Sequence, residues 1–130
     1  MTELKIQKPF KTFRLIKGGT VKIRIDSIYY FKSYGYITEM YCHNGNEIEK
    51  HMLNMRLGDI ELSFKHNPKF AFNFFRSHRS YFVNLNHVTP YGKYPLPIIE
   101  FTDGLTAQLA RRRKLDFHQR WVKLKKAIKS

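Results

Sequence analysis

The chain has 130 residues and a mass of 15.6 kDa, which is the length of one domain and too short for two. Its 24 lysines and arginines outnumber ten acidic residues, for a net charge of +14, yet 42% of its residues are hydrophobic, so the composition excludes a disordered polycation. The single cysteine, Cys42, excludes an internal disulfide and a paired-cysteine zinc ribbon, and no apolar run reaches the roughly 18 residues of a membrane span.

The first half of the chain has the pattern of short strands joined by tight turns. Alternating apolar and polar residues on either side of Gly18-Gly19 predict a hairpin. Residues 34–36 and 43–46 have the composition of loops, and the second of them is a hairpin turn. The predicted strands cover residues 12–16, 21–25, 28–31, 37–42 and 47–52.

The second half adds two helices to further strands. The spacing i, i+4, i+7, i+11 predicts helices with the apolar faces Leu53, Leu57, Ile60 and Phe64, and Phe117, Trp121, Leu124 and Ile128. Asn54 is a candidate cap for the first helix, and Asn67-Pro68 ends it. Strands are predicted over residues 72–75, 81–83, 86–91, 97–101 and 105–109. The sequence therefore predicts one mostly β domain with two helices.

The positive charge is concentrated at the two ends of the chain. Residues 1–25 carry a net charge of +6 and residues 111–130 carry +8, whereas the two middle segments, 26–69 and 70–110, carry −1 and +1. If the ends meet in the fold, they form one electropositive face; if not, they are two solvated tails. The four consecutive cations at 111–114 repel one another unless an anion relieves them, so we interpret that run as a binding segment.

The N-terminus has no apolar signal core, so we expect a cytoplasmic protein, and a compact basic domain of this kind favours a polyanion as its partner. Few features of the sequence support an enzymatic function. Cys42 and His43 are neighbours on a predicted strand and face opposite sides, and His78 and His87 lack ligand spacing with Cys42. No glycine-rich phosphate loop is present. We expect no catalytic residue, metal, cofactor or small-molecule substrate.

The most informative segment is residues 75–85, F-R-S-H-R-S-Y-F-V-N-L, with Leu109-Ala-Arg-Arg-Arg113 further along. These residues resemble the LytTR family of bacterial DNA-binding domains, whose core is F-x-R-x-H-R-S-Y-x-V-N-L, followed by a hairpin and a Ser-Arg-Arg-like step into the last helix. Residues 26–31, D-S-I-Y-Y-F, match the family's D-x-I-x-y-i strand. The resemblance covers about residues 10–125. Ala110 departs from the family's serine, and residues 34–38 are atypically aromatic.

The resemblance implies a compact, elongated β-sandwich of short strands that reads double-stranded DNA through loops in successive major grooves. It implies a transcription regulator that uses direct repeats, with two copies on one face of the DNA. Because 130 residues cannot also hold a receiver domain, we expect either a stand-alone regulator or the output domain of a response regulator, and we favour the first. Stand-alone members can be held inactive by a membrane-protein partner.

The resemblance also assigns the DNA contacts. Arg79 is expected to form a bidentate contact with guanine, the alternative being an internal ion pair. Ser80 donates to a phosphate or caps the local backbone. Of Arg111 and Arg112, one reaches bases and the other phosphate. Arg113 and Lys114 are expected on phosphates, the alternative being a solvated helix start.

The loop at residues 34–38 supplies the third contact in the family. Here we expect it from Tyr36 and Thr38, with Lys32 a weaker phosphate candidate. Three further residues have structural roles: His78 orients the turn, Asn84 fixes a strand end by hydrogen bonding, and Trp121 belongs to the core.

The alternative function is that of a generic polyanion-binding module. RNA would need exposed aromatic residues on a strand face, and residues 29–31, Y-Y-F, are candidates. An anionic membrane surface would instead be met by the basic C-terminal helix with its apolar stripe.

Overall fold

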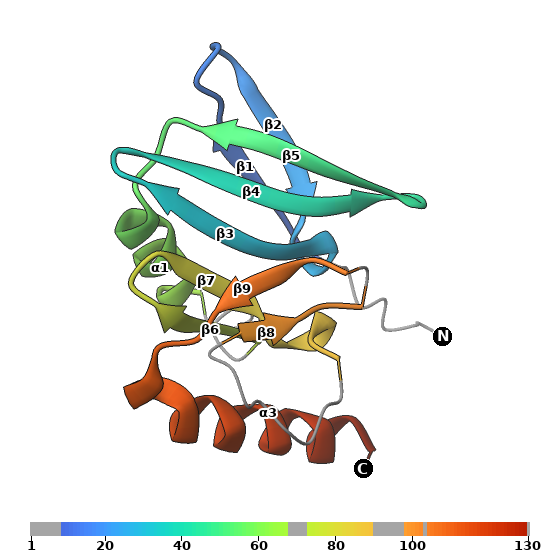
Figure 1. The fold of residues 1–130 in the computed structure, drawn as a ribbon. Coiled ribbons are helices and arrows are strands. Elements are labelled where there is room, and N and C mark those ends of the chain that lie inside the picture. The colour runs from blue at the N-terminus through green and yellow to red at the C-terminus, as the bar shows by residue number, and fades with distance from the viewer. Residues whose placement is uncertain (1–8, 68–72, 90–97, 103, 130) are drawn as a thin grey trace.

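The computed structural model describes residues 9–67, 73–89, 98–102 and 104–129 (Figure 1). Their strands are β1 (Phe10–Arg14), β2 (Thr20–Arg24), β3 (Ile28–Tyr34), β4 (Ile37–Asn44), β5 (Glu47–Leu53), β6 (Phe74–His78), β7 (Tyr81–Asn84), β8 (Ile98–Glu100) and β9 (Thr106–Gln108). The helices are α1 (Leu57–Lys65) and α3 (Lys114–Lys129), with short 3-10 turns η1 (Ile25–Ser27), η2 (Leu85–His87) and η3 (Arg111–Arg113). The prediction of a mostly β chain with two helices is confirmed.

The central element is a five-stranded antiparallel sheet in the order β5-β4-β3-β7-β6. One face packs against the β1–β2 hairpin and α1, through buried residues such as Phe13, Phe31 and Phe64. The other face packs against the two-stranded β8–β9 sheet and α3, through residues such as Val83 and Phe117. Apolar burial on both faces gives the layered arrangement that the resemblance implied.

The first hairpin forms where it was predicted. Gly18 and Gly19 have φ values of 102° and 77°, a backbone region that residues with a Cβ avoid, so this turn requires glycine. Its strands are shifted toward the N-terminus relative to the prediction, because Leu15 leaves β1 and forms an isolated bridge with Leu53 of β5. That bridge attaches the hairpin to the edge of the central sheet.

Two predictions assign residues to the wrong kind of element. Leu53 ends β5 instead of opening the helix, and α1 begins at Leu57 with Arg56 in the cap position, so Asn54 is not the cap. Residues 86–91 are not a strand where the structure describes them. The Asn84 side chain accepts a hydrogen bond from the Asn86 amide and stabilises the turn η2, which replaces the strand ladder there. Predictions at residues 68, 72, 90, 91 and 97 lie outside the described residues.

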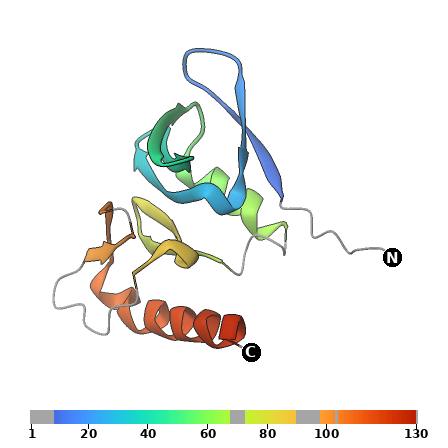
Figure 2. The ribbon, with the colours of Figure 1, turned by 90° about the vertical axis from the view of Figure 1, so that its right-hand side faces the viewer.

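Within the described residues, the basic segments 9–25 and 111–129 do not meet. Figures 1 and 2 show the β1–β2 hairpin and α3 at opposite ends of the molecule, with the central sheet between them. Phe117 and Leu124 of the apolar stripe of α3 face inward and are only 1% and 4% exposed, whereas the side chain of Ile128 lies outside the described part of the structure. Within the described part of the chain, neither helix has the length and apolar character needed to cross a membrane.

Candidate nucleic-acid interface

The turn between β6 and β7 is held in shape by Arg76. Its Nε donates to the carbonyl of His78 at 3.0 Å, and its Nη2 donates to the carbonyl of Arg79 at 2.5 Å. The remaining nitrogen, Nη1, pairs with Glu61 Oε1 of α1 at 2.5 Å. Because the Arg76 side chain is only 20% exposed, its guanidinium acts as an internal bracket for the turn.

A second contact fixes the turn from within. His78 Nδ1 accepts a hydrogen bond from the Ser80 amide at 3.0 Å, which requires this nitrogen to be unprotonated. Burial, and then the charges of Arg79 and Arg76, lower the pKa of His78. The Ser80 carbonyl accepts from the Ser33 amide at 2.8 Å, which joins the turn to β3. The prediction that His78 orients this turn is confirmed.

The segment before α3 is attached to β6. The Ala110 amide donates to the Ser77 carbonyl at 2.7 Å, and Ser77 Oγ donates to the Gln108 carbonyl at 2.8 Å. Arg113 Nη1 donates to the Arg76 carbonyl at 3.1 Å. Ala110 occupies the cap position of η3 and provides no side-chain hydrogen bond there. These contacts place Arg111 and Arg112, both exposed, beside the β6–β7 turn.

An open groove of about 350 Å³ lies between these two segments. Arg79 from the turn and Arg112 and Arg113 from η3 line it, and Glu61, already paired with Arg76, is the acidic residue among its lining. A second and larger groove of about 810 Å³ shares His78 and Ala110 with it and is also lined by Tyr81, Arg111 and Lys114. Cations from two segments more than thirty residues apart therefore converge on one surface.

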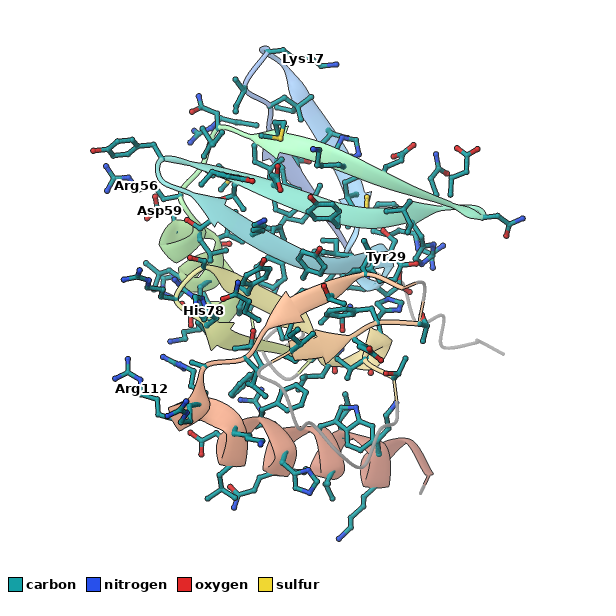
Figure 3. All side chains as sticks on the ribbon, viewed as in Figure 1. Lys17, Tyr29, Arg56, Asp59, His78 and Arg112 are labelled. Atoms are coloured by element: carbon teal, nitrogen blue, oxygen red, sulfur yellow. The ribbon has the colours of Figure 1, made fainter. Side chains whose placement is uncertain are left out.

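The turn between β3 and β4 extends this surface. Tyr36 is 74% exposed, and the Arg56 guanidinium lies over its ring at 4.6 Å from the centroid. Lys32 places its ammonium 5.2 Å from the Tyr34 ring centroid and 5.9 Å from that of Tyr81, which links this turn to β7. Figure 3 shows Arg56, His78 and Arg112 along one side of the molecule. We call this surface the loop face; its cationic and aromatic residues are Lys32, Tyr36, Arg56, Arg79, Arg111, Arg112, Arg113 and Lys114.

Thr38 does not belong to the loop face, contrary to the prediction. It is fully buried, and its Oγ1 donates to the Met55 carbonyl at 2.8 Å, so neither its methyl nor its hydroxyl is available to DNA. The alternation of β4 points Thr38 inward one residue after Ile37. Its contact instead fixes the segment that carries Arg56.

The internal ion pair considered for Arg79 is made by Arg76. In the described ranges, Arg79 has no salt bridge and its side chain is exposed, whereas Arg76 pairs with Glu61. Ser80 is half-buried. Arg113 is also half-buried, and one of its nitrogens donates to the Arg76 carbonyl. Arg113 therefore both stabilises the site and lines the groove. Sequence reasoning missed Arg76, although it stands inside the F-x-R-x-H motif.

Arg56 was also missed as a site residue. The signal was available, because a cation at the start of a helix opposes the helix dipole and needs another reason to be there. Arg56 is exposed, holds the cap position of α1 without a side-chain cap, and stacks on Tyr36. It therefore joins the candidate set.

The remaining candidates from the sequence contribute to the fold and not to the loop face. Asn84 is 1% exposed and donates from Nδ2 to the Ile28 carbonyl at 2.9 Å, which confirms its predicted role. Trp121 is half-buried against the second core. Cys42 faces the core, and burial raises the pKa of its thiol to about 11, whereas the ring of His43 lies 5.7 Å from that of Tyr29 on the other face. These neighbours are therefore not a nucleophile and base.

The structure removes the features that supported the alternative partners. Tyr29, Tyr30 and Phe31 are 2%, 5% and 0% exposed, so they offer no stacking platform to RNA. Phe117, Trp121 and Leu124 of the apolar stripe of α3 pack in the second core, so these residues cannot also lie on lipid.

Comparisons with known proteins point to one family. The family model described as the LytTr DNA-binding domain matches residues 18–122. Among solved structures, the chain is similar to the LytTr DNA-binding domain of a methyl-accepting/DNA response regulator from Bacillus cereus. The two share 17% sequence identity with a TM-score of 0.64, over 88% of this chain and 97% of that chain. That likeness shows the fold. No curated protein matches the sequence.

Proposed function

The chain belongs to the LytTr family of DNA-binding domains, and from this premise we propose that its loop face reads a specific double-stranded sequence. Membership of this family implies DNA binding in transcription regulation. We further propose that the protein acts in a bacterial cytoplasm and that its loops enter successive major grooves of the DNA.

The observation that carries this proposal is the convergence of Arg79 and Arg112 on one groove. The two residues come from separate segments, and each segment is fixed by hydrogen bonds that leave these two side chains exposed. A guanidinium presents a rigid fork to guanine O6 and N7 and needs such a fixed base to discriminate between base pairs. We therefore assign base contacts to Arg79 and to one of Arg111 and Arg112.

The other members of the loop face have positioning contacts with DNA in this proposal. Lys114 is exposed at the start of α3 and neutralises a phosphate, which adds affinity without sequence choice. Arg113 contributes a phosphate contact through the nitrogens not used on Arg76. Tyr36 and Arg56 together meet the backbone at the third loop, and Ser80 donates to a phosphate beside Arg79.

The family habit of direct repeats leads us to propose that two copies occupy one site, on one face of the duplex, with centres separated by a helical turn or a multiple of it. In this proposal the copies associate when DNA aligns them. Footprinting on the DNA that flanks the chain's own gene would locate the site and measure the spacing.

The decisive experiment compares Arg79→Ala and Arg112→Ala on single-base-pair variants of that site and on random DNA. Each substitution should cost on the order of 1–3 kcal/mol of discrimination, at different base pairs, while affinity for random DNA changes much less. Arg24→Ala is the matched control, because Arg24 is exposed, pairs with Asp26, and lies on β2 away from the loop face. Circular dichroism checks folding.

Two outcomes would overturn the proposal. If Arg79→Ala weakens every DNA sequence equally, Arg79 is a phosphate contact and not a reader of bases. If RNA or anionic vesicles compete as well as the duplex site, the chain is a generic polyanion binder.

A further inference from the structure

Three side chains capable of binding a metal meet on the β4–β5 hairpin. The antiparallel register pairs Cys42 with Glu49, and His51 follows two residues later on the same face of β5. The ligand atoms of the three residues all lie within 4.8 Å of one another. His51 Nε2 and Glu49 Oε1 are 3.2 Å apart. We propose that Cys42, Glu49 and His51 form a Zn²⁺ site, with water as the fourth ligand.

The spacing is close to what zinc requires. With Zn–S near 2.3 Å and Zn–N or Zn–O near 2.0–2.1 Å, two ligand atoms of a tetrahedral site stand about 3.3–3.6 Å apart. The distance of 3.2 Å between His51 Nε2 and Glu49 Oε1 is just below this range. Since no ligand pair is more than 4.8 Å apart, the sulfur needs to approach the other two atoms by about 1.2 Å at most, which side-chain rotation of Glu49 and His51 can supply.

The donor set suits zinc better than a hard cation. Sulfur, imidazole nitrogen and carboxylate oxygen are the three ligand types of zinc sites, whereas magnesium and calcium prefer oxygen alone. On binding, the thiol releases its proton to solvent and the neutral imidazole carries its proton on Nδ1, so thiolate and carboxylate balance the two positive charges. No redox step is involved.

The surroundings support a site that is both oriented and accessible. Asn44 Nδ2 donates to Glu49 Oε2 at 2.9 Å, which leaves Oε1 directed at His51 and serves as an outer contact of the kind that orients metal ligands. Cys42 is 1% exposed, but the Glu49 and His51 side chains are 38% and 22% exposed, so an ion can enter from solvent. Residues 26–69 also carry a net charge of −1 within a chain of +14, so a cation meets little repulsion here.

The site would join the edge strand β5 to β4 at a distance from the loop face. Ile37 begins β4 beside the Tyr36 turn, and Cys42 follows five residues later, about 17 Å along the strand. Zinc should therefore stabilise the sheet without competing with DNA. The inference does not depend on the proposed DNA contacts, and it predicts that Cys42→Ser leaves DNA affinity unchanged.

The test is metal binding by untagged protein that has first been treated with a chelator. Calorimetry with Zn²⁺ should give one ion per chain at micromolar concentrations and a rise in melting temperature. Co²⁺ should show the near-ultraviolet charge-transfer absorption of a thiolate ligand, which Cys42→Ser abolishes. Glu49→Gln and His51→Gln should each weaken Zn²⁺ binding more than Asn44→Ala, for which about tenfold is the expected loss of an outer contact.

His43→Gln is the matched control, because His43 is adjacent to Cys42 in sequence but packs against Tyr29 on the other face of β4. It should leave Zn²⁺ affinity unchanged. If Cys42→Ser fails to fold, as judged by its melting curve without metal, His51→Gln on the edge strand decides the question. Absence of Zn²⁺ binding at micromolar concentrations, or wild-type affinity in any of the three ligand variants, overturns the site.

Discussion

Removing the Arg76 side chain should damage both stability and DNA discrimination, although the proposed function gives Arg76 no contact with DNA. Arg76→Ala deletes two hydrogen bonds from a charged donor to carbonyls of the β6–β7 turn and leaves Glu61 without its closest partner. Hydrogen bonds of this type contribute about 1.5–3 kcal/mol each, and water replaces part of that where the side chain is 20% exposed. We expect a loss of about 3 kcal/mol in the free energy of unfolding.

Thermal and chemical denaturation measure this loss. For a domain of this size, about 3 kcal/mol corresponds to a fall in Tm of roughly 10 °C. Arg24→Ala is the control, since its ion pair with Asp26 is also bidentate but has side chains 44% and 43% exposed. Exposed pairs of that kind contribute little to stability because water competes for both partners, so Arg24→Ala should barely move the Tm.

The effect on DNA should pass through Arg79, whose carbonyl Arg76 holds. A double-mutant cycle with Arg76→Ala and Arg79→Ala tests this on cognate and random DNA. Arg76→Ala alone should reduce discrimination, but it should add no further loss once Arg79 is alanine. Should the single variant prove unfolded, Arg76→Lys keeps a charge near Glu61 without the three-way fork and serves instead. Additive losses would refute the reasoning, because Arg76 would then act independently of Arg79.

Three other perturbations have expected outcomes. Lys114→Ala should make the slope of log affinity against log salt shallower by about one and weaken cognate and random DNA alike; a titration series from low to high salt measures it, and an unchanged slope removes Lys114 from the interface. Because the pKa of His78 is lowered in the folded state, its stabilising effect is complete above the unfolded value near 6.5 and is lost as the pH falls below it. Tm should therefore fall less between about pH 7.5 and pH 5.5 in His78→Gln than in the wild type, and equal falls would contradict this. Ala110→Ser should raise stability by about 0.5–1 kcal/mol, since residue 110 has the extended backbone of a cap, φ −66° and ψ 138°, without a capping side chain; a lower Tm would show that the hydroxyl is not accommodated.

The sequence predicted those elements whose signals are local. Gly18-Gly19 marked the first hairpin, and the helical spacing of Phe117 and Leu124 marked α3, because turn chemistry and amphipathic periodicity depend only on near neighbours. The spacing misassigned Leu53, which coincides with the helical stripe but pairs with Thr38 in the sheet. Apolar periodicity alone cannot distinguish the end of a strand from the start of a helix.

The pairing register of β4 with β5 was also not predictable from the sequence. The turn was predicted over residues 43–46, which would have paired Cys42 with Glu47. The structure instead closes the hairpin on Gly45 and Asn46, with Asn44 opposite Glu47, and this moves Glu49 opposite Cys42. The cluster of Cys42, Glu49 and His51 forms because the observed pairing is shifted by two residues from the predicted one, so the cluster could not be predicted from the sequence.

The residues of the candidate site were also predicted only in part. Arg79, Arg111 and Arg112 were predicted from the motif, and all three are exposed on the loop face. What holds them was not predictable, because the contacts of Arg76 with Glu61 and of Arg113 with Arg76 join residues 15 and 37 positions apart. Such contacts depend on how α1 and η3 pack beside β6, which no local pattern specifies.

The attachment of η3 and of the β6–β7 turn has an evolutionary consequence. The hydrogen bonds that fix both segments include those of Arg76, Ser77, His78, the Ala110 amide and Arg113. The exposed side chains of Arg79, Arg111 and Arg112 take no part in those contacts. Under the proposed function, exchanging an exposed arginine should therefore alter which base pair is preferred, while the hydrogen bonds beneath it stay in place. Under the same proposal, a duplicated gene would acquire a new set of promoters by single substitutions at these positions, and each such variant is expected to fold.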